Sequence, residues 1–257
     1  MPLAILKNPV KAIDKAVIKV SCIMPTRGRR HFVGQAIKYF LAQCYQDKEL
    51  IIVDDAQHTC DAVADLIPPN TLDNPNIPNI RYFRLPYGQS IGAKRNFANQ
   101  QALGQVILHW DDDDWMAANW ITTALNALLT TKADVTGIQE VFYYQPTTGQ
   151  AWQYCYPQGQ QTWVLGGSLC YLKSFWQRNR FDDINIGEDN AFLWSTASKR
   201  IVPHHNSQLY IGMIHSTNTS IKQVRSACWQ SVDPQIVRQI LHKDKPYYDA
   251  FNGRDRD

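Results

Sequence analysis

The sequence predicts an α/β fold with a mostly parallel central sheet and helices on both faces. Short β-branched runs alternate with segments of helical apolar spacing over residues 16–110, which is the pattern of strand–helix–strand units. Three predicted strands also end in polar residues or proline, at Pro25–Arg27, Asp54–Asp55 and Asp111–Asp114. Because such sheets bind ligands beyond the carboxyl ends of their strands, we expect these residues to meet at one ligand-binding edge.

The amino-terminal half supplies the parallel strands. Residues 16–24 (AVIKVSCIM) form a β-branched run that Pro25 ends, and residues 31–46 place apolar side chains at the spacing of an amphipathic helix. Further strands are predicted at 49–55, 80–85 and 105–110. The connections are predicted as a short helix at 62–67, a Pro/Asn-rich loop at 68–79 and a helix at 91–103.

The pattern changes after residue 130. Residues 133–156 alternate like a β-hairpin around a Thr-Thr-Gly turn, and a Gly-Glu-Asp turn at 187–189 runs into a helix. We also expect a helix near 173–178 and a strand followed by a polar loop within 204–220. The chain then divides into an amino-terminal arm (1–17), one domain (18–220) and a helical tail with a frayed end (221–257).

Composition excludes several classes of protein. With 257 residues, of which 44% are hydrophobic and 19% charged, the chain can bury the core of one globular domain. The net charge of +3 is small and no basic run alternates with aromatic residues, so we expect no nucleic-acid partner. The six cysteines form no CxxC pair, and the apolar surroundings of Cys22 and Cys44 predict buried free thiols rather than disulfides or a zinc site.

The amino-terminal arm has a basic amphipathic pattern. Lysine recurs at every fourth position from Lys7 to Lys19, with apolar residues between. Such a segment either lies peripherally on the anionic inner face of a membrane or docks on the domain with a solvated lysine face, and Pro9 interrupts any helix. The sequence shows no signal-peptide core and no apolar stretch long enough to span a membrane, so we expect a soluble, cytoplasmic protein.

Four consecutive aspartates, Asp111–Asp114, follow the apolar run 106–110, and the stretch 115–124 contains no basic residue. At about 4 Å and an effective dielectric constant near 20, each like pair costs on the order of 4 kcal/mol. The run therefore predicts a partner of positive charge. An acidic helix cap is the alternative, but one aspartate would satisfy a cap.

Four segments resemble, in the same order, the blocks of family 2 glycosyltransferases. They are VSCIMPTRGRRHFVGQAIKYFLAQCYQDKELIIVDDA (20–56), GQSIGAKRNFANQQALGQVILHWDDDDWM (88–116), GEDNAFLW (187–194) and HSTNTS (215–220). The resemblance covers residues 18–220. It implies a single Rossmann-like domain of the nucleotide-diphospho-sugar transferase fold, with a nucleotide-binding half at 18–115 and an acceptor half at 116–220.

The resemblance implies a metal-dependent, inverting glycosyltransferase with Mn²⁺ or Mg²⁺ as cofactor. It would move a hexosyl or N-acetylhexosaminyl group from a nucleotide-sugar donor, UDP-linked, to a growing polysaccharide, a glycan or a glycolipid. Two alternatives stay open. A catalytically inactive sugar-nucleotide-binding or assembly module would hydrolyse no donor. A nucleotidyltransferase of related fold would need a glycine-rich phosphate loop with a lysine, whereas PTRGRR offers only Gly28.

Within the aspartate run, the resemblance identifies Asp111 and Asp113 as the DXD pair. It implies that Asp113 binds the metal directly and that Asp111 contacts the ribose or a metal-bound water. Asp112 would point elsewhere within the donor site. In some relatives a histidine at the position of His215 completes the metal site, and imidazole suits Mn²⁺ better than Mg²⁺. A purely structural His215 is the alternative.

The resemblance places the base and ribose site at the ends of the first two strands. Its residues would be Pro25, Thr26, Arg27, Asp54 and Asp55. Asp55 would accept a hydrogen bond from uracil N3–H, which cytosine lacks, or else cap its strand. Arg27 stands where the family often carries an aromatic residue. Arg95, with Lys94 beside it, would reach the diphosphate or brace the aspartates, unless the pair forms a solvated helix face.

Displacement at the anomeric carbon needs a base for the acceptor hydroxyl. The resemblance gives this role to Asp189, with Glu188 orienting it or binding the acceptor. An acidic helix start after Gly187 is the alternative. An α-linked donor would then give a β-linked product.

The acceptor side carries weaker signals. Its border would be formed by Trp163, Gly166 and Gly167. Asp114 would either face the sugar or cap the following helix. His204 and His205 are expected at the surface.

Overall fold

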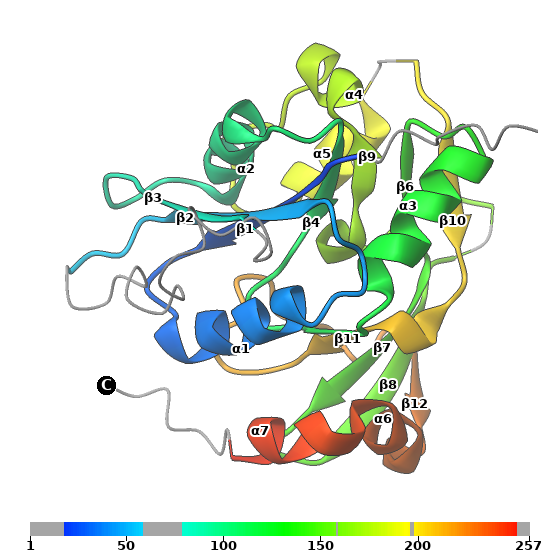
Figure 1. Ribbon diagram of the computed structural model, residues 1–257. Coiled ribbons are helices and arrows are strands. Elements are labelled where there is room, and N and C mark those ends of the chain that lie inside the picture. The colour runs from blue at the N-terminus through cyan, green and yellow to red at the C-terminus, as the bar shows by residue number, and fades with distance from the viewer. Residues whose placement is uncertain (1–17, 59–78, 158, 196–197, 251–257) are drawn as a thin grey trace, which may run out of the picture.

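A seven-stranded sheet forms the centre of the molecule, which the computed structural model describes at residues 18–58, 79–157, 159–195 and 198–250 (Figure 1). Its strands are β1 Val20–Thr26, β2 Lys48–Asp54, β3 Asn79–Arg84, β4 Val106–His109, β6 Val135–Ile138, β9 Cys170–Leu172 and β10 Ile201–His204. Their order is β10-β6-β9-β4-β1-β2-β3. Strands β4, β1, β2 and β3 are parallel neighbours, β9 runs antiparallel between β4 and β6, and β10 is parallel to β6. The predicted, mostly parallel sheet is confirmed.

Helices cover both faces of this sheet, as expected (Figure 1). One face packs on α1 (Arg30–Leu41) and α3 (Trp120–Thr130), and the other on α2 (Ile91–Gln101), α4 (Lys173–Arg178) and α5 (Glu188–Trp194). Because successive side chains of a strand point to opposite faces, Cys22 and Met24 join the core under α1, whereas Ile23 joins the core under α2. With both faces covered, β1 and β2 are buried along almost their whole length.

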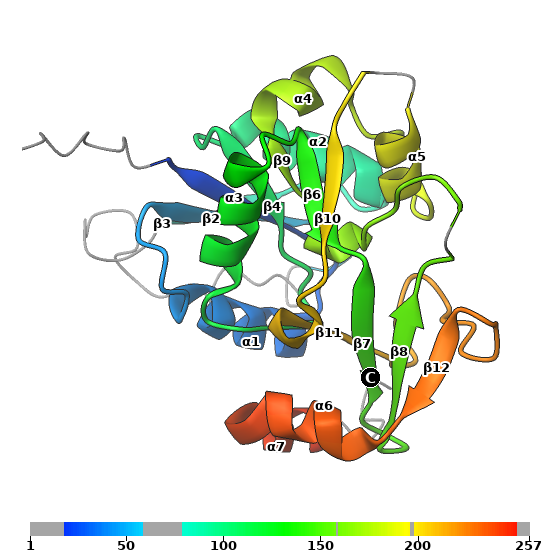
Figure 2. The ribbon, with the colours of Figure 1, turned by 90° about the vertical axis from the view of Figure 1, so that its right-hand side faces the viewer.

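A smaller five-stranded sheet lies beside the central one and packs against α6 (Pro234–Leu241) (Figure 2). Its strands, in the order β12-β8-β7-β11-β5, are β12 Trp229–Val232, β8 Gln150–Cys155, β7 Glu140–Gln145, β11 Tyr210–Met213 and β5 Trp115–Met116. The predicted hairpin is confirmed as β7 and β8, which pair antiparallel around a turn in which Gly149 has φ +66°. The residues that precede it, β6, instead join the central sheet.

The tail is not purely helical. Strand β12 pairs antiparallel with β8, with Trp229 opposite Tyr154, before α6 and α7 (Lys245–Asp249) begin. The prediction of a helical tail from residue 221 is therefore wrong at its start. A four-residue strand of this kind exists because β8 offers its backbone groups for pairing, and a local sequence pattern does not encode that partner.

Some predictions lie outside the described residues. They are the arm at 1–17, the helix at 62–67, most of the loop at 68–79 and the frayed end at 251–257. Within the part of the chain that the structure describes, no helix has the length and apolar character needed to cross a membrane.

Two local expectations about burial need correction. Cys22 is buried, as predicted, but Cys44 is exposed because α1 ends before it. His205 is exposed, whereas His204 packs on the Trp120 ring at a centroid distance of 5.5 Å and has both ring nitrogens buried. Burial lowers the pKa of His204 to about 4, so the side chain is neutral at pH 7.

Candidate active site

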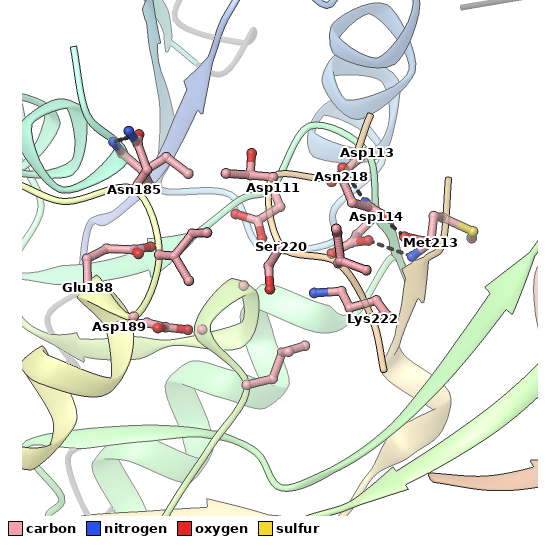
Figure 3. A pocket seen from close by; sticks show the side chains of 18 of the residues that line it. Asp111, Asp113, Asp114, Asn185, Glu188, Asp189, Met213, Asn218, Ser220 and Lys222 are labelled. Atoms are coloured by element: carbon pink, nitrogen blue, oxygen red, sulfur yellow. Dashed lines mark hydrogen bonds between the residues drawn. The ribbon is translucent and has the colours of Figure 1, made fainter. Parts of the chain in front are cut away.

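A cavity of about 830 Å³ opens beyond the carboxyl ends of β1 and β4, between α2, α5 and the second sheet (Figure 3). The predicted site residues that line it are Pro25, Thr26, Arg27, Lys94, Arg95, Asp111, Asp112, Asp113, Asp114, Trp163, Gly166, Gly167, Glu188 and Asp189. Asp54 and Asp55 are fully buried, and His215 contacts one of the aspartates. The structure thus brings the residues that the sequence singled out to one place.

Arg29 is the positive partner that the aspartate run requires, and sequence reasoning missed it. Its guanidinium pairs with Asp112, lies 2.8 Å from Asp113 Oδ2, and stands 5.1 Å from the centre of the Phe32 ring. Asp112 also accepts a 2.6 Å hydrogen bond from Thr26 Oγ1. Asp112 is buried and fully engaged, so it ties the end of β1 to the aspartate run. The only signal in the sequence was a second arginine in PTRGRR.

Asp114 anchors the second sheet. It accepts a hydrogen bond from Tyr210 Oη and another, at 2.8 Å, from the Met213 backbone N–H. Helix α3 begins only at Trp120 with Asn119 as its cap residue, so the expected helix-cap role of Asp114 is wrong. The side chain joins the aspartate run to both ends of β11.

Asp113 is paired with His215. His215 Nε2 lies 2.9 Å from Asp113 Oδ2, and the other ring nitrogen lies 2.9 Å from Thr217 Oγ1. Burial by itself would raise the pKa of Asp113, but Arg29 and His215 hold it well below its usual range. Asp113 is therefore ionised at neutral pH.

The surroundings of Asp111 disfavour its ionised form. Burial raises its pKa to about 6; Arg95, whose Nη2 lies 3.7 Å from Asp111 Oδ1, opposes the rise, and the charges of Asp113 and Asp112 add to it. A Cβ added at Gly167 would overlap Asp111 Oδ2, so the loop can approach this carboxylate only because residue 167 is glycine.

Asp113, His215 and Asp111 offer donors that suit a divalent cation, because carboxylate oxygen and imidazole nitrogen both bind Mn²⁺. The 2.9 Å between Asp113 Oδ2 and His215 Nε2 is close to the ~3 Å expected between neighbouring ligands of an octahedral ion with ~2.1 Å bonds. Within the described residues, no three histidine, cysteine or acidic side chains form a complete metal site. Mg²⁺-type ions commonly take one or two carboxylates and complete their shell with substrate phosphates. The residues therefore fit a cation that arrives with a diphosphate.

Both oxygens of Asp55 are already engaged. Arg27 Nη2 donates to Oδ2 at 2.8 Å, Lys94 Nζ lies 2.6 Å from Oδ1, and the Gly88 amide donates to Oδ2 at 3.1 Å. Burial favours the protonated acid, yet Arg27 and Lys94 lower the pKa of Asp55 below its usual value. In this arrangement Asp55 orients Arg27, whose side chain is 43% exposed at the cavity wall.

Asp54 holds the turn after β1. It accepts hydrogen bonds from the backbone N–H groups of Gly28 and Ala56, both at 2.9 Å, and from Tyr82 Oη at 3.0 Å. The Gly28 amide is thus directed at a carboxylate. A phosphate loop would leave that amide free for a phosphate, so the arrangement counts against the nucleotidyltransferase alternative.

Lys94 and Arg95 point into the protein. Their exposed fractions are 3% and 5%, so the interpretation of a solvated helix face is wrong. Lys94 Nζ donates to the Thr26 carbonyl oxygen at 2.8 Å. Arg95 forms an ion pair with Glu188 and reaches towards Asp111. Arg95 therefore joins the aspartate run to the Gly-Glu-Asp turn.

The two acidic residues of that turn have different surroundings. Gly187, with φ +84°, opens α5, and Glu188 turns inward to its arginine. Asp189 Oδ1 accepts a 2.8 Å hydrogen bond from the Asn190 amide, and a Cβ added at Gly166 would overlap Asp189 Oδ2. Figure 3 shows Asp189 across the pocket from Asp113 and its neighbours. No ion pair of Asp189 occurs within the described residues.

Three aromatic residues of the second sheet also line the cavity, and none was predicted. They are Tyr143 on β7, Tyr154 on β8 and Trp229 on β12. The first two lay in a hairpin whose location in the fold was unknown. Trp229 lies in the tail, where no local pattern indicates a strand.

Solved structures share the fold. Staphylococcus aureus TarS (residues 1–349) in complex with UDP-GlcNAc has a TM-score of 0.59 at 16% identity, and the match covers 91% of this chain and 73% of that one. Mannosyltransferase PcManGT from Pyrobaculum calidifontis, in complex with GDP-Man and Mn²⁺, has a TM-score of 0.59 at 12% identity, covering 92% and 73%. At these identities the likeness establishes the class of fold, a nucleotide-diphospho-sugar transferase fold, and nothing finer.

The family follows from the sequence comparison. The model of glycosyl transferase family 2 matches residues 21–190, more than half of the chain, and the chain belongs to that family. An uncharacterized glycosyltransferase of Haemophilus influenzae is 32% identical over 110 residues, which are 43% of this chain and 42% of the relative. The putative colanic acid biosynthesis glycosyl transferase WcaA of Escherichia coli is 28% identical over 176 residues, 68% of this chain and 57% of the relative. The chain thus spans about half the length of these relatives.

Proposed function

We propose that the protein is a metal-dependent, inverting glycosyltransferase that uses a UDP-linked sugar as its donor. One observation carries the proposal: Asp111 and Asp113 line the same pocket as Asp189, which lies across from them, and His215 contacts Asp113 at 2.9 Å. Membership of glycosyl transferase family 2 supports sugar transfer from a nucleotide. Similar folds have been solved with UDP, with UDP-GlcNAc, and with GDP-Man and Mn²⁺.

Asp113 and His215 would hold the divalent cation, with Asp111 next to it. Bound there, Mn²⁺ or Mg²⁺ supplies positive charge that neutralises the departing diphosphate. A metal binds the ionised carboxylate, and Asp113 is kept in that form by Arg29 and His215 despite its burial. The protein therefore presents this ligand ready for a cation at neutral pH.

Asp189 would take the proton of the acceptor hydroxyl as that oxygen attacks the anomeric carbon. Glu188 is committed to its ion pair with Arg95, which leaves Asp189 as the carboxylate for this role. The Asn190 amide fixes one of its oxygens, and Gly166 keeps the space beside the other. A single displacement inverts the configuration, so an α-linked donor gives a β-linked product.

The donor nucleotide would lie along the cationic side of the pocket. Arg27, Arg29 and Lys94 line that side, and each is anchored by an aspartate. The anchored guanidinium of Arg27 can donate hydrogen bonds to the carbonyl oxygens of uracil. We therefore assign base contact to Arg27 and a positioning role to Asp55, in place of the direct contact expected from the resemblance. The group transferred would be a hexosyl or N-acetylhexosaminyl residue.

The acceptor would be a growing polysaccharide, a glycan or a glycolipid. The similarity to WcaA, a putative colanic acid biosynthesis glycosyl transferase, supports a polysaccharide. A peripheral contact of the lysine-rich arm at 1–17 with the inner face of the membrane stays a prediction, which binding to anionic vesicles with and without the arm would test.

Calorimetric titration with UDP, GDP and CDP, each with and without Mn²⁺, tests the donor and the metal. We expect UDP to bind and Mn²⁺ to strengthen its binding. In Asp113→Asn the effect of Mn²⁺ should disappear. Unchanged UDP affinity of this variant in the presence of Mn²⁺ would exclude Asp113 as a ligand. A folded protein that binds none of the nucleotides would favour an inactive assembly module.

Hydrolysis of UDP-glucose, UDP-galactose and UDP-GlcNAc tests the base. Asp189→Asn should bind UDP as the wild type does and lose turnover, because the amide cannot accept the proton. The exposed Asp182→Asn is the matched control and should keep its turnover. Near-normal turnover of Asp189→Asn would exclude it as the base.

A further inference from the structure

One side of the pocket is built from aromatic rings that meet at steep angles, which we name the aromatic wall: Tyr143, Tyr154, Trp163 and Trp229. Tyr154 lies 5.1 Å from Trp163 and 5.1 Å from Trp229, measured between ring centroids, and Trp229 lies 4.7 Å from Tyr143. These distances are typical of aromatic pairs that stabilise one another. The rings therefore form a continuous surface of fixed shape.

The strand pairing explains why this surface faces the pocket. Trp229 on β12 stands directly opposite Tyr154 on β8, and side chains opposite each other on neighbouring strands share a face of the sheet. Tyr154 and Trp229 are partly exposed, whereas Trp163 and Tyr143 are 8% and 5% exposed. The first two rings are thus available to a ligand, and the other two support them from behind.

The aromatic wall is joined to the carboxylate proposed as the base. Trp163 Nε1 donates to Asn190 Oδ1 at 3.1 Å, and the Asn190 backbone N–H donates to Asp189 Oδ1 at 2.8 Å. Asn190 therefore links the Trp163 indole to the Asp189 carboxylate through two hydrogen bonds. A molecule that rests on the aromatic wall lies beside the group that would take its proton.

The chemistry of this side of the pocket suits a sugar ring. A pyranose has a face of C–H groups, which an aromatic face attracts, and a rim of hydroxyls, which need polar partners. Two lining residues supply such partners beside the rings: Lys222, whose Nζ lies 5.7 Å from the centre of the Tyr143 ring, and Asn190, which accepts the hydrogen bond of Trp163. A lipid chain would leave these amide and ammonium groups without partners in a desolvated pocket, which is costly.

We propose that the aromatic wall is the acceptor subsite and that the acceptor is a saccharide whose ring packs between the inclined faces of Tyr154 and Trp229 with a hydroxyl directed at Asp189. This inference rests on the proposed function and narrows its acceptor to a sugar ring. It also gives the tail a role in acceptor binding, through Trp229.

Saturation-transfer NMR on the protein loaded with UDP and Mn²⁺ tests the proposal. The probes are the methyl β-glycosides of glucose, galactose, mannose and N-acetylglucosamine, together with cellobiose and lactose; dihexanoyl phosphatidylglycerol is the lipid probe. We expect at least one saccharide to receive saturation at its ring C–H protons, and the lipid to receive none. No transfer to any saccharide, with UDP bound, would overturn the inference and leave the proposed function standing. If UDP itself does not bind, the proposed function fails and the inference fails with it.

Variants of the aromatic wall test whether Tyr154 and Trp229 bind the saccharide. Trp229→Ala and Tyr154→Ala should weaken saccharide binding about tenfold, the size of effect an aromatic contact produces, and Trp229→Phe should recover part of the loss. Gln230→Ala is the matched control, because its side chain lies on the same strand, faces the other way and is exposed. UDP affinity should stay unchanged in all four. Equal weakening by Gln230→Ala, or no weakening by both alanine variants of the wall, would overturn the role assigned to these rings.

Discussion

Replacing Asp111 with asparagine should stabilise the metal-free protein while it weakens metal-dependent nucleotide binding. Burial raises the pKa of this carboxyl to about 6, and the neighbouring aspartates add to the rise although Arg95 opposes it. The folded protein therefore disfavours the ionised form that is present at pH 7. Asparagine has nearly the shape of the protonated acid and carries no charge, so the substitution removes this cost.

The magnitude follows from the pKa. The difference between about 6 and the ordinary value of 3.8 corresponds to about 3 kcal/mol at a pH above both values. Because 29% of the Asp111 side chain is exposed, water screens part of this energy, and we expect a gain of about 1–2 kcal/mol in the free energy of unfolding. For a chain of this length that gain raises Tm by about 2–8 °C.

The stability difference between Asp111→Asn and the wild type should depend on pH. A raised pKa in the folded state means that wild-type stability falls as the pH rises from about 4 to about 6, so the advantage of Asp111→Asn should be absent near pH 4 and complete above about pH 7. Urea denaturation of the variant and the wild type in EDTA, at several pH values between 4 and 7, measures this difference in the free energy of unfolding. Asp113→Asn is the control, and its stability should change in the opposite direction. Arg29 and His215 favour the ionised form of Asp113, so this variant should be less stable than the wild type at pH 7. An Asp111→Asn variant that is less stable at pH 7, or equally stabilised at every pH, would refute the reasoning.

Three further outcomes are expected. Arg29→Ala removes the positive partner of the buried carboxylates Asp112 and Asp113 and should lower the free energy of unfolding, measured in urea, by about 3–5 kcal/mol. A loss below about 1 kcal/mol would contradict the role of Arg29 as that partner. Gly167→Ala should weaken Mn²⁺-dependent UDP binding, since the added Cβ would overlap Tyr210 Oη and the Asp111 carboxylate and displace them. Its control is Gly34→Ala in α1, where the Cβ meets no atom of the described chain within 4 Å; that variant should bind UDP normally and gain about 0.5–1 kcal/mol in stability. Arg27→Ala should weaken UDP binding about tenfold in calorimetry, the loss expected for one charged hydrogen-bonding contact, and unchanged affinity would remove Arg27 from the donor site.

The central strands and the positions of the acidic groups were predictable because their signals are local. β1 and β2 are short apolar runs whose ends are marked by Pro25 and Asp54, and the aspartate run follows β4 directly. The Gly-Glu-Asp turn is marked by Gly187 at the start of α5. Each of these features depends on a few neighbouring residues, so the sequence is enough to locate it.

The partners of these groups could not be predicted, because the contacts join distant parts of the chain. Arg29 and Asp112 are 83 positions apart, and Asp114 and Tyr210 are 96 apart. Such pairs form only when elements pack in a particular register, which no local pattern specifies. The same reason explains Asp55: its place at a strand end was evident, but not that Lys94 of α2 would reach it.

Strand β12 has a consequence for where the protein can be shortened. Strand β8 is hydrogen-bonded to β7 on one side and to β12 on the other, so its backbone groups are satisfied on both sides. A chain cut at residue 220 would bare a row of unpaired N–H and C=O groups beside Tyr154 and the other rings of the hairpin. An open strand next to an apolar surface is the arrangement that recruits other chains into aggregates. A shortened form that keeps β8 paired on both sides therefore runs on through β12 and the helix α6 that packs on this hairpin.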